Sequence, residues 1–167
     1  MRKFVHAAAA ASVLLVAAGC QNAFSDADGP LTGTWRFTAM GYQPNPTDST
    51  YACDLQTTYV MRQEGSEIEG RSDAATFHCR NTGTGRVFPS DFKEAGVVRG
   101  PVKHGAFDVS DSGNWHCLGE LSSGSPARLE GHLESYGGWV GQPMRTVRSG
   151  SCVLEKISDA GYDGPAA

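Results

Sequence analysis

The cysteines are the residues of this chain whose type and spacing define a chemistry most clearly. There are five, one at the end of an apolar N-terminal run and four distributed over the rest of the chain: Cys20, Cys53, Cys79, Cys117 and Cys152. In an oxidising compartment an even set of thiols is expected to form disulfides. The later four therefore predict two disulfides if the chain is exported, and Cys20 needs a separate role.

The N-terminus has the pattern of a secretory signal. Arg2 and Lys3 precede an apolar run from Ala7 to Ala18, which is too short to span a bilayer. The run ends in Val16-Ala17-Ala18-Gly19-Cys20, which resembles the lipobox of bacterial lipoproteins. The resemblance implies a signal peptide over residues 1–19, with Cys20 diacylated as the new first residue.

The same resemblance implies a location in the cell envelope. The chain would be lipid-anchored on the extracytoplasmic side, at the outer membrane of a Gram-negative host because Gln21 rather than Asp follows the cysteine. More than one acyl chain gives stable anchoring. The lipobox usually has Leu at the position of Ala17, so cleavage by the ordinary signal peptidase stays an alternative.

The charge of the mature chain argues against nucleic acid as a partner. Removing Arg2 and Lys3 leaves 12 basic against 18 acidic side chains, a net charge of −6. A phosphate-binding surface needs clustered Lys and Arg, and the sequence has no such cluster. Residues 20–30 are polar and small and predict a flexible tether, residues 31–157 one domain, and residues 158–167 a disordered tail.

The domain reads as a succession of β-strands. Between Leu55 and Ser72 apolar and polar residues alternate on both sides of a break at Glu64-Gly65, which predicts a hairpin with Met61 opposite Ile68. Similar patterns predict strands over residues 31–38, 97–103, 106–110, 115–121, 128–134 and 147–157, with a turn at His104-Gly105. Eight consecutive antiparallel strands close most simply into an up-and-down barrel.

The start of the first strand, Gly33-Thr34-Trp35, resembles the lipocalin and avidin-like group of eight-stranded barrels. That resemblance implies an all-β barrel and, as a family habit, the binding of a small apolar ligand. Four strands also repeat a glycine at an inner-facing position: Gly70, Gly100, Gly119 and Gly131. Barrel curvature is the preferred explanation, and a roomy lumen for a ligand is the alternative.

The hairpin brings Cys53 and Cys79 to its open end, where the two side chains are expected to be close enough to form a disulfide. Cys117 is then left with Cys152. Their strands are separated by a third, so Cys152 is expected to bend over from a loop. Four cysteines permit three pairings, and this is the preferred one.

Aromatic residues mark the predicted ligand site. Trp115, Tyr136 and Trp139 are expected near one mouth of the barrel, and Tyr59 is the fourth candidate ligand residue. The alternative is an apolar plug over the core, because side chains usually fill small eight-stranded barrels. The stretch from Phe77 to Ala95 is the longest irregular segment and the first candidate for a functional loop.

Motifs for catalysis or metal binding are missing from the sequence. It contains no nucleophile elbow, phosphate loop or HExxH motif, and His78-Cys79 and His116-Cys117 lack zinc-ligand spacing. We therefore expect no enzyme activity, no cofactor and no metal. The expected function is a non-catalytic envelope lipoprotein that binds a small apolar ligand. The alternatives are an interaction or inhibitor module for an envelope protein, which would use surface loops, and a structural lipoprotein.

Overall fold

The computed structural model describes residues 29–43, 49–88, 92–111, 115–121, 127–137 and 145–164. The regular structure there is entirely β, and no helix in these ranges is long and apolar enough to cross a membrane. The strands are β1 (Gly33–Tyr42), β2 (Tyr51–Glu64), β3 (Glu67–Ser72), β4 (Ala75–Thr76), β5 (His78–Asn81), β6 (Phe92–Lys93), β7 (Gly96–Lys103), β8 (Ala106–Asp111), β9 (Trp115–Glu120), β10 (Arg128–Gly137) and β11 (Arg145–Ser158).

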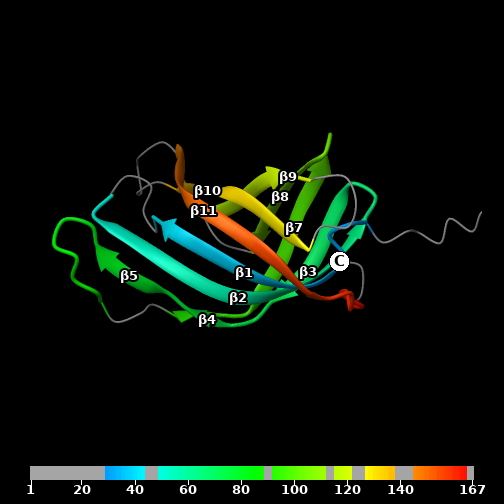
Figure 1. Ribbon diagram of the computed structural model, residues 1–167, viewed down its shortest axis with the longest axis horizontal. Helices are drawn as coiled ribbons and strands as arrows, with labels where there is room; N and C mark the ends of the chain where they lie inside the picture. The colour runs from blue at the N-terminus through cyan, green and yellow to red at the C-terminus, as the bar shows by residue number, and fades with distance from the viewer. Residues whose placement is uncertain are drawn as a thin grey trace, which may run out of the picture.

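Eight of these strands form a closed antiparallel barrel, as the sequence predicted. Their order around the wall is β1-β2-β3-β7-β8-β9-β10-β11, and β11 returns to pair with β1 (Figure 1). Each barrel strand therefore pairs with the next one along the chain. Closure removes the unpaired edges that an open sheet would expose, apart from the short additions described below.

The alternation of side chains explains why these segments are strands. In β2 every second residue from Cys53 to Gln63 is buried, and in β8 the buried positions are Phe107, Val109 and Asp111. A period of two places one set of side chains in the lumen and the other in solvent. The interior is filled by large side chains that are 0–1% exposed, among them Trp35, Phe37, Tyr59, Met61, Ile68 and Phe107.

The register of the first hairpin differs from the prediction by two residues. Met61 lies opposite Gly70 rather than Ile68, and the turn is Gly65-Ser66 rather than Glu64-Gly65. Gly65 has φ +57° at the first central position, as a type II′ turn requires. A shift of two keeps the same face inward, so the predicted core residues stay in the core. In the second hairpin Val102 lies opposite Phe107, as predicted.

The four repeated glycines bring neighbouring strands close together. A Cβ on Gly119 would lie 2.6 Å from the backbone oxygen of Glu130, and one on Gly70, Gly100 or Gly131 would overlap a carbonyl oxygen of the adjacent strand. Real Cβ atoms do not approach backbone this closely, and backbone in a paired strand cannot move aside cheaply. The contacts support barrel curvature as the reason for the repeat.

Gly100→Ala is expected to lower the free energy of unfolding by roughly 1–3 kcal/mol, because its methyl group would overlap Asp108 O in β8. Gly83→Ala is the matched control. Gly83 lies in an exposed turn, its nearest heavy atom would be 3.5 Å from the new Cβ, and its φ is not in the left-handed region. Urea unfolding of both variants measures the difference. Equal midpoints for the two would contradict this account of the glycine repeat.

Both expected disulfides are present. Cys53 and Cys79 are directly opposite in β2 and β5, and Cys117 bonds Cys152 across β10 with a Cα–Cα distance of 6.0 Å. The expectation that Cys152 bends over from a loop is wrong, because it lies inside β11. The bridge passes over Gly131 of β10, where a Cβ would be 3.0 Å from Cys152 Sγ. The missing side chain leaves the space for the disulfide.

One end of the barrel, which we call the closed end, is sealed by the two ends of the domain. It carries the turns at residues 65–66 and 104–105 and lies at the right of Figure 1, near the C-terminus. Leu31 is fully buried there and its carbonyl accepts a hydrogen bond from Trp35 Nε1 (2.9 Å). Thr34 Oγ1 donates to Ala160 O and Tyr162 N to Met61 O. The first part of the predicted disordered tail, up to residue 164, therefore contacts the barrel instead.

Candidate functional site

The opposite end of the barrel carries the longest connection, residues 73–95 between β3 and β7, which we call the insert. The prediction of an irregular stretch from Phe77 to Ala95 needs correction, because β5 and β6 lie within it. β5 continues along the edge of β2 that β3 has left, and the Cys53–Cys79 disulfide bonds it to β2. In Figure 1 this part lies at the left, beside the start of β2. The insert is thus tied covalently to the barrel wall.

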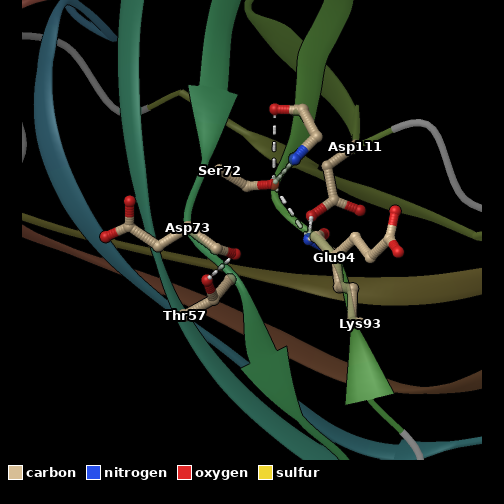
Figure 2. Close-up of polar contacts among 7 residues, drawn as sticks. Thr57, Ser72, Asp73, Lys93, Glu94 and Asp111 are labelled. Carbon is tan, nitrogen blue, oxygen red and sulfur yellow. Dashed lines mark hydrogen bonds and ion pairs between the residues drawn. The ribbon is translucent and has the colours of Figure 1, made fainter.

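A second part of the insert positions a lysine over the barrel interior. β4 and β6 form a separate two-stranded sheet, with Ala75 opposite Lys93. Lys93 Nζ lies 2.7 Å from Asp111 Oδ2 at the end of β8 and donates a hydrogen bond of 2.9 Å to Ser72 Oγ at the end of β3 (Figure 2). The Lys93 side chain is 11% exposed and that of Asp111 is fully buried. The insert therefore supplies the counter-ion of a carboxylate that belongs to the barrel.

Aromatic rings fill the interior next to this ion pair. Phe37 of β1 stacks on Tyr59 of β2 at a centroid distance of 4.6 Å and on Trp115 of β9 at 5.0 Å. Because β10 and β11 separate β1 from β9 around the wall, the stack crosses the lumen. Tyr42 continues the cluster, edge-on to Trp115 at 6.1 Å and stacked on Phe77 of the insert at 5.7 Å. The rings thus lead from the centre of the barrel to the insert.

The buried polar groups at this level contact one another without well-oriented hydrogen bonds. Tyr59 Oη and both carboxylate oxygens of Asp111 are buried and form no well-oriented hydrogen bond among the described residues. Lys93 forms an ion pair with Asp111, and the Tyr59 hydroxyl lies within hydrogen-bonding reach of the same carboxylate. At the closed end, by contrast, buried Gln63 receives a hydrogen bond from Leu31 N and donates to Gly65 O. Unsatisfied buried polar groups are rare and destabilising in folded proteins. The buried polar side chains at the two ends of the lumen therefore differ in how well they are hydrogen-bonded.

Burial is the main cause of the altered pKa values of the ionisable side chains in this cluster. Burial raises the pKa of Asp111, and the hydrogen bond and charge of Lys93 oppose that rise. Burial raises the pKa of Tyr42 to about 12, with the charge of Asp111 as the second cause. Burial, the charge of Asp111 and a hydrogen-bonding contact with Asp111, in that order, raise the pKa of Tyr59 well above its usual value. Tyr42 and Tyr59 both lie close enough to Asp111 to respond to its charge.

The raised tyrosine pKa values predict a loss of stability in alkali. A tyrosine whose folded-state pKa is about 12 rather than 10.0 stabilises the fold fully below pH 10.0, and this contribution is lost as the pH rises towards 12. For Tyr42 the full loss is on the order of 3 kcal/mol. About half of this loss falls between about pH 9 and about pH 11, and urea midpoints at those two pH values measure it. Tyr42→Phe should reduce the fall between the two pH values, and an unchanged fall would contradict the assignment.

The contact between Ser72 and Lys93 also has the composition of a nucleophile and a base. A lysine acts as a general base only when its amine is neutral. Asp111, 2.7 Å from the same nitrogen, stabilises the charged ammonium instead. Ser72 is itself 2% exposed, which hinders the approach of a substrate. The arrangement is suited to holding a charge in place rather than to attacking a substrate.

The structure accounts for some of the predicted ligand residues. Tyr59 and Trp115 are both in the aromatic cluster, and both are buried. Tyr136 is in β10 opposite Thr146, but its side chain, like Trp139 and Cys20, lies outside the described residues. The cysteines of the two His-Cys pairs are in disulfides. No group of three or more His, Cys, Asp or Glu in the described ranges could hold a metal ion.

The sequence analysis missed Ser72, Lys93 and Asp111 as site residues. A signal was present for two of them, because Ser72 follows Ile68 and Gly70 in the inward phase of β3, and Asp111 follows Phe107 and Val109 in β8. A charged residue in the inward phase of a strand is a candidate for a paired or functional group.

Neither a protein-family model nor a curated protein nor a solved structure matches this chain.

Proposed function

We propose that this chain is a membrane-anchored, extracytoplasmic lipoprotein that binds a small, mainly apolar molecule at the insert end of its barrel without catalysing a reaction. The main support for this proposal is the contrast in hydrogen bonding between the two ends of the lumen. At the closed end buried Gln63 forms internal hydrogen bonds, while Tyr59 and Asp111 contact each other without a well-oriented hydrogen bond. A bound molecule is one explanation for buried polar groups that the protein does not satisfy itself.

The aromatic stack limits where the ligand can lie. Because Phe37, Tyr59 and Trp115 cross the lumen, a ligand cannot lie deep in the barrel without displacing them. A ligand beside Tyr42 and Phe77 would leave the stack in place, because the stack meets the insert there and Phe77 is only partly buried. Aromatic side chains with a few polar groups are the usual lining of small-molecule sites.

Binding of a fluorescent apolar dye tests the proposal. The dye should bind the purified domain with one site per chain and quench Trp115. Phe77→Ala should weaken binding by about tenfold or more, a loss of about 1.4 kcal/mol, because Phe77 forms the outer wall of the site. Val97→Ala is the control, since Val97 is 49% exposed on the outside of β7. Equal affinity of the two variants would exclude this position for the ligand.

Lipid anchoring through Cys20 is part of the proposal and has a separate test. Two disulfides agree with export to an oxidising compartment. The variant Cys20→Ser should move from the membrane fraction to the soluble extracytoplasmic fraction, because the lipid would be its only strong membrane attachment. Membrane retention of that variant after a salt wash would refute anchoring through this residue.

A second candidate function, binding to an envelope protein, is favoured by the outer surface of the insert. Val87 is 67% exposed, and Tyr51 packs edge-on to Phe88, whose ring also carries the Arg86 guanidinium at 5.5 Å. Aromatic residues and Arg are typical of interaction hot spots. Val87→Asp should remove a cross-linked partner from envelope preparations while dye binding is kept. Unchanged cross-linking would argue against this surface.

A further inference from the structure

We propose that Asp111 is the anchor for a positively charged amino group on the ligand, and that Lys93 occupies this anchor as a tethered cation when no ligand is bound. This inference rests on the proposed function and adds the chemical class of the molecule: a small primary amine with an apolar or aromatic body. In the ligand complex the ligand ammonium would replace the lysine ammonium beside the carboxylate.

The Asp111 carboxylate is buried and incompletely hydrogen-bonded, which suits it to bind a cation. Asp111 is fixed in β8, its side chain has no exposed surface, and neither of its oxygens has a well-oriented hydrogen bond among the described residues. Among the described residues its counter-ion is Lys93, at 2.7 Å, and hydrogen-bonding contacts with Tyr59 and Ser72 also lower its pKa. Burying an ionised carboxylate is costly unless it is paired and hydrogen-bonded. The anchor therefore has unused acceptor capacity that a second or better-placed donor could fill.

The two partners of the ion pair differ in how they are held. Lys93 belongs to β6, whose pairing with β4 consists of two residue pairs in a sheet separate from the barrel. Its side chain is long and flexible and 11% exposed, and its ammonium would exchange its bonds to Asp111, Ser72 Oγ and Glu94 O for hydration by water. Rotation of this one side chain frees the carboxylate. Exchange with a ligand ammonium keeps the charge of the interior unchanged, so no buried charge is left unpaired.

The surroundings of the carboxylate are aromatic. Tyr59 and Tyr42 lie close enough to Asp111 for its charge to affect both phenols, and Trp115 is stacked in the same cluster. Aromatic faces attract organic cations when water is excluded. The rings therefore suit the methylene or aryl groups next to a ligand ammonium.

The charges around the site select against acidic ligands. Lys93, the cation at this site among the described residues, is already paired with Asp111 (Figure 2). Lys93 Nζ also donates to the backbone oxygen of Glu94 (3.3 Å). A carboxylate ligand would have to compete with Asp111 for the Lys93 ammonium. An amine ligand would instead form an ion pair with the Asp111 carboxylate. Neutral analogues gain the apolar contacts only.

Calorimetric titration with three isosteric probes tests the inference: 2-phenylethylamine, 2-phenylethanol and phenylacetate. The wild-type chain should bind the amine about tenfold or more tightly than the alcohol, and phenylacetate weakest. Lys93→Ala removes the competing cation and should bind the amine at least about tenfold more tightly than the wild type. Asp111→Asn should lose the preference for the amine while keeping the alcohol affinity. Lys103→Ala, an exposed lysine of β7, is the control and should match the wild type.

The outcomes separate this inference from the proposed function. If the alcohol binds the wild type as tightly as the amine, the amine anchor is wrong and the apolar site stands. If no probe binds the wild type or Lys93→Ala, while the apolar dye still binds, the amine anchor is again wrong. If neither the dye nor any probe binds, both proposals fail. The wild-type comparison needs no variant to fold, so a poorly folded Lys93→Ala would not rescue the inference.

Discussion

Lys93→Met is expected to lower the free energy of unfolding at neutral pH by about 3–5 kcal/mol. The substitution keeps most of the side-chain volume and removes the charge. It would leave Asp111, whose side chain is fully buried, without its counter-ion at 2.7 Å. An uncompensated buried carboxylate is far more destabilising than the loss of a surface ion pair. Urea unfolding monitored by circular dichroism measures the effect.

Two controls assign this loss to the buried charge. Lys103→Met on the exposed part of β7 should change stability by no more than about 0.5 kcal/mol. The double variant Lys93→Met/Asp111→Leu should recover most of the loss, because apolar side chains often replace a buried ion pair without penalty. If Lys93→Met alone is as stable as the wild type, the ion pair does not balance Asp111.

The same loss should depend on pH in a defined direction. Burial already raises the pKa of Asp111 above its usual value of 3.8, and removing Lys93 removes a cause that lowers it. A carboxyl group whose folded-state pKa is raised keeps its stability below pH 3.8 and loses it as the pH rises through the folded-state pKa. The deficit of Lys93→Met should therefore be small in acid and grow towards neutral pH.

Phe37→Ala is expected to cost about 3–5 kcal/mol of stability, because it removes the central ring of the stack that crosses the lumen. Phe37 is fully buried and contacts Tyr59 and Trp115 at centroid distances of 4.6 and 5.0 Å. The cavity would adjoin Trp115, so its fluorescence should shift to the red as water enters. Guanidinium unfolding and the emission spectrum measure the two effects together.

Met40→Ala is the matched control for Phe37→Ala. Met40 is on the same strand but 44% exposed on the outer surface, so its truncation should have little effect on stability or on Trp115 fluorescence. Similar losses for the two variants would contradict an interior packed around Phe37. The contrast also tests the position of the proposed ligand, because a lumen that tolerates Phe37→Ala could admit a ligand deeper than Tyr42.

The alternation of apolar and polar residues was sufficient to predict the barrel. The register of the β2–β3 hairpin could be determined only from the structure. The inward phase of residues such as Tyr59, Met61 and Ile68 is determined by a period of two, which is local in sequence. The turn at Gly65-Ser66 instead of Glu64-Gly65 depends on the conformation of Gly65, with φ +57°. Two turns that differ by one residue preserve the same inward face, so alternation cannot separate them.

The disulfides show a second limit. The sequence led to the correct pairing of Cys117 with Cys152, but the route across Gly131 depends on how strongly the sheet coils at β10. Flat-sheet spacing gave a separation too large for a bridge, whereas the Cα atoms are 6.0 Å apart. Coiling arises from many contacts distant in sequence, such as those at the repeated glycines, and sequence spacing alone does not report it.

The candidate site was only partly predictable for the same reason. Tyr59 and Trp115 were selected as aromatic residues of the barrel, and both are in the cluster. Lys93 and Asp111 are close because β6, which is outside the barrel sheet, lies against the end of β8. β6 has two residues, too few to show any period in the sequence. Only the inward phases of Ser72 and Asp111 could have indicated the site beforehand.

Native mass spectrometry of the chain purified from its own membranes, with Cys20 intact, tests the central claim most directly. The claim is that the insert end of the barrel binds one small, mainly apolar molecule. It predicts a single additional small mass per chain that dissociates on activation and is absent from the variant Phe77→Ala. A chain with no dissociable mass beyond its covalent lipid, combined with no uptake of the apolar dye after solvent extraction, would contradict the claim.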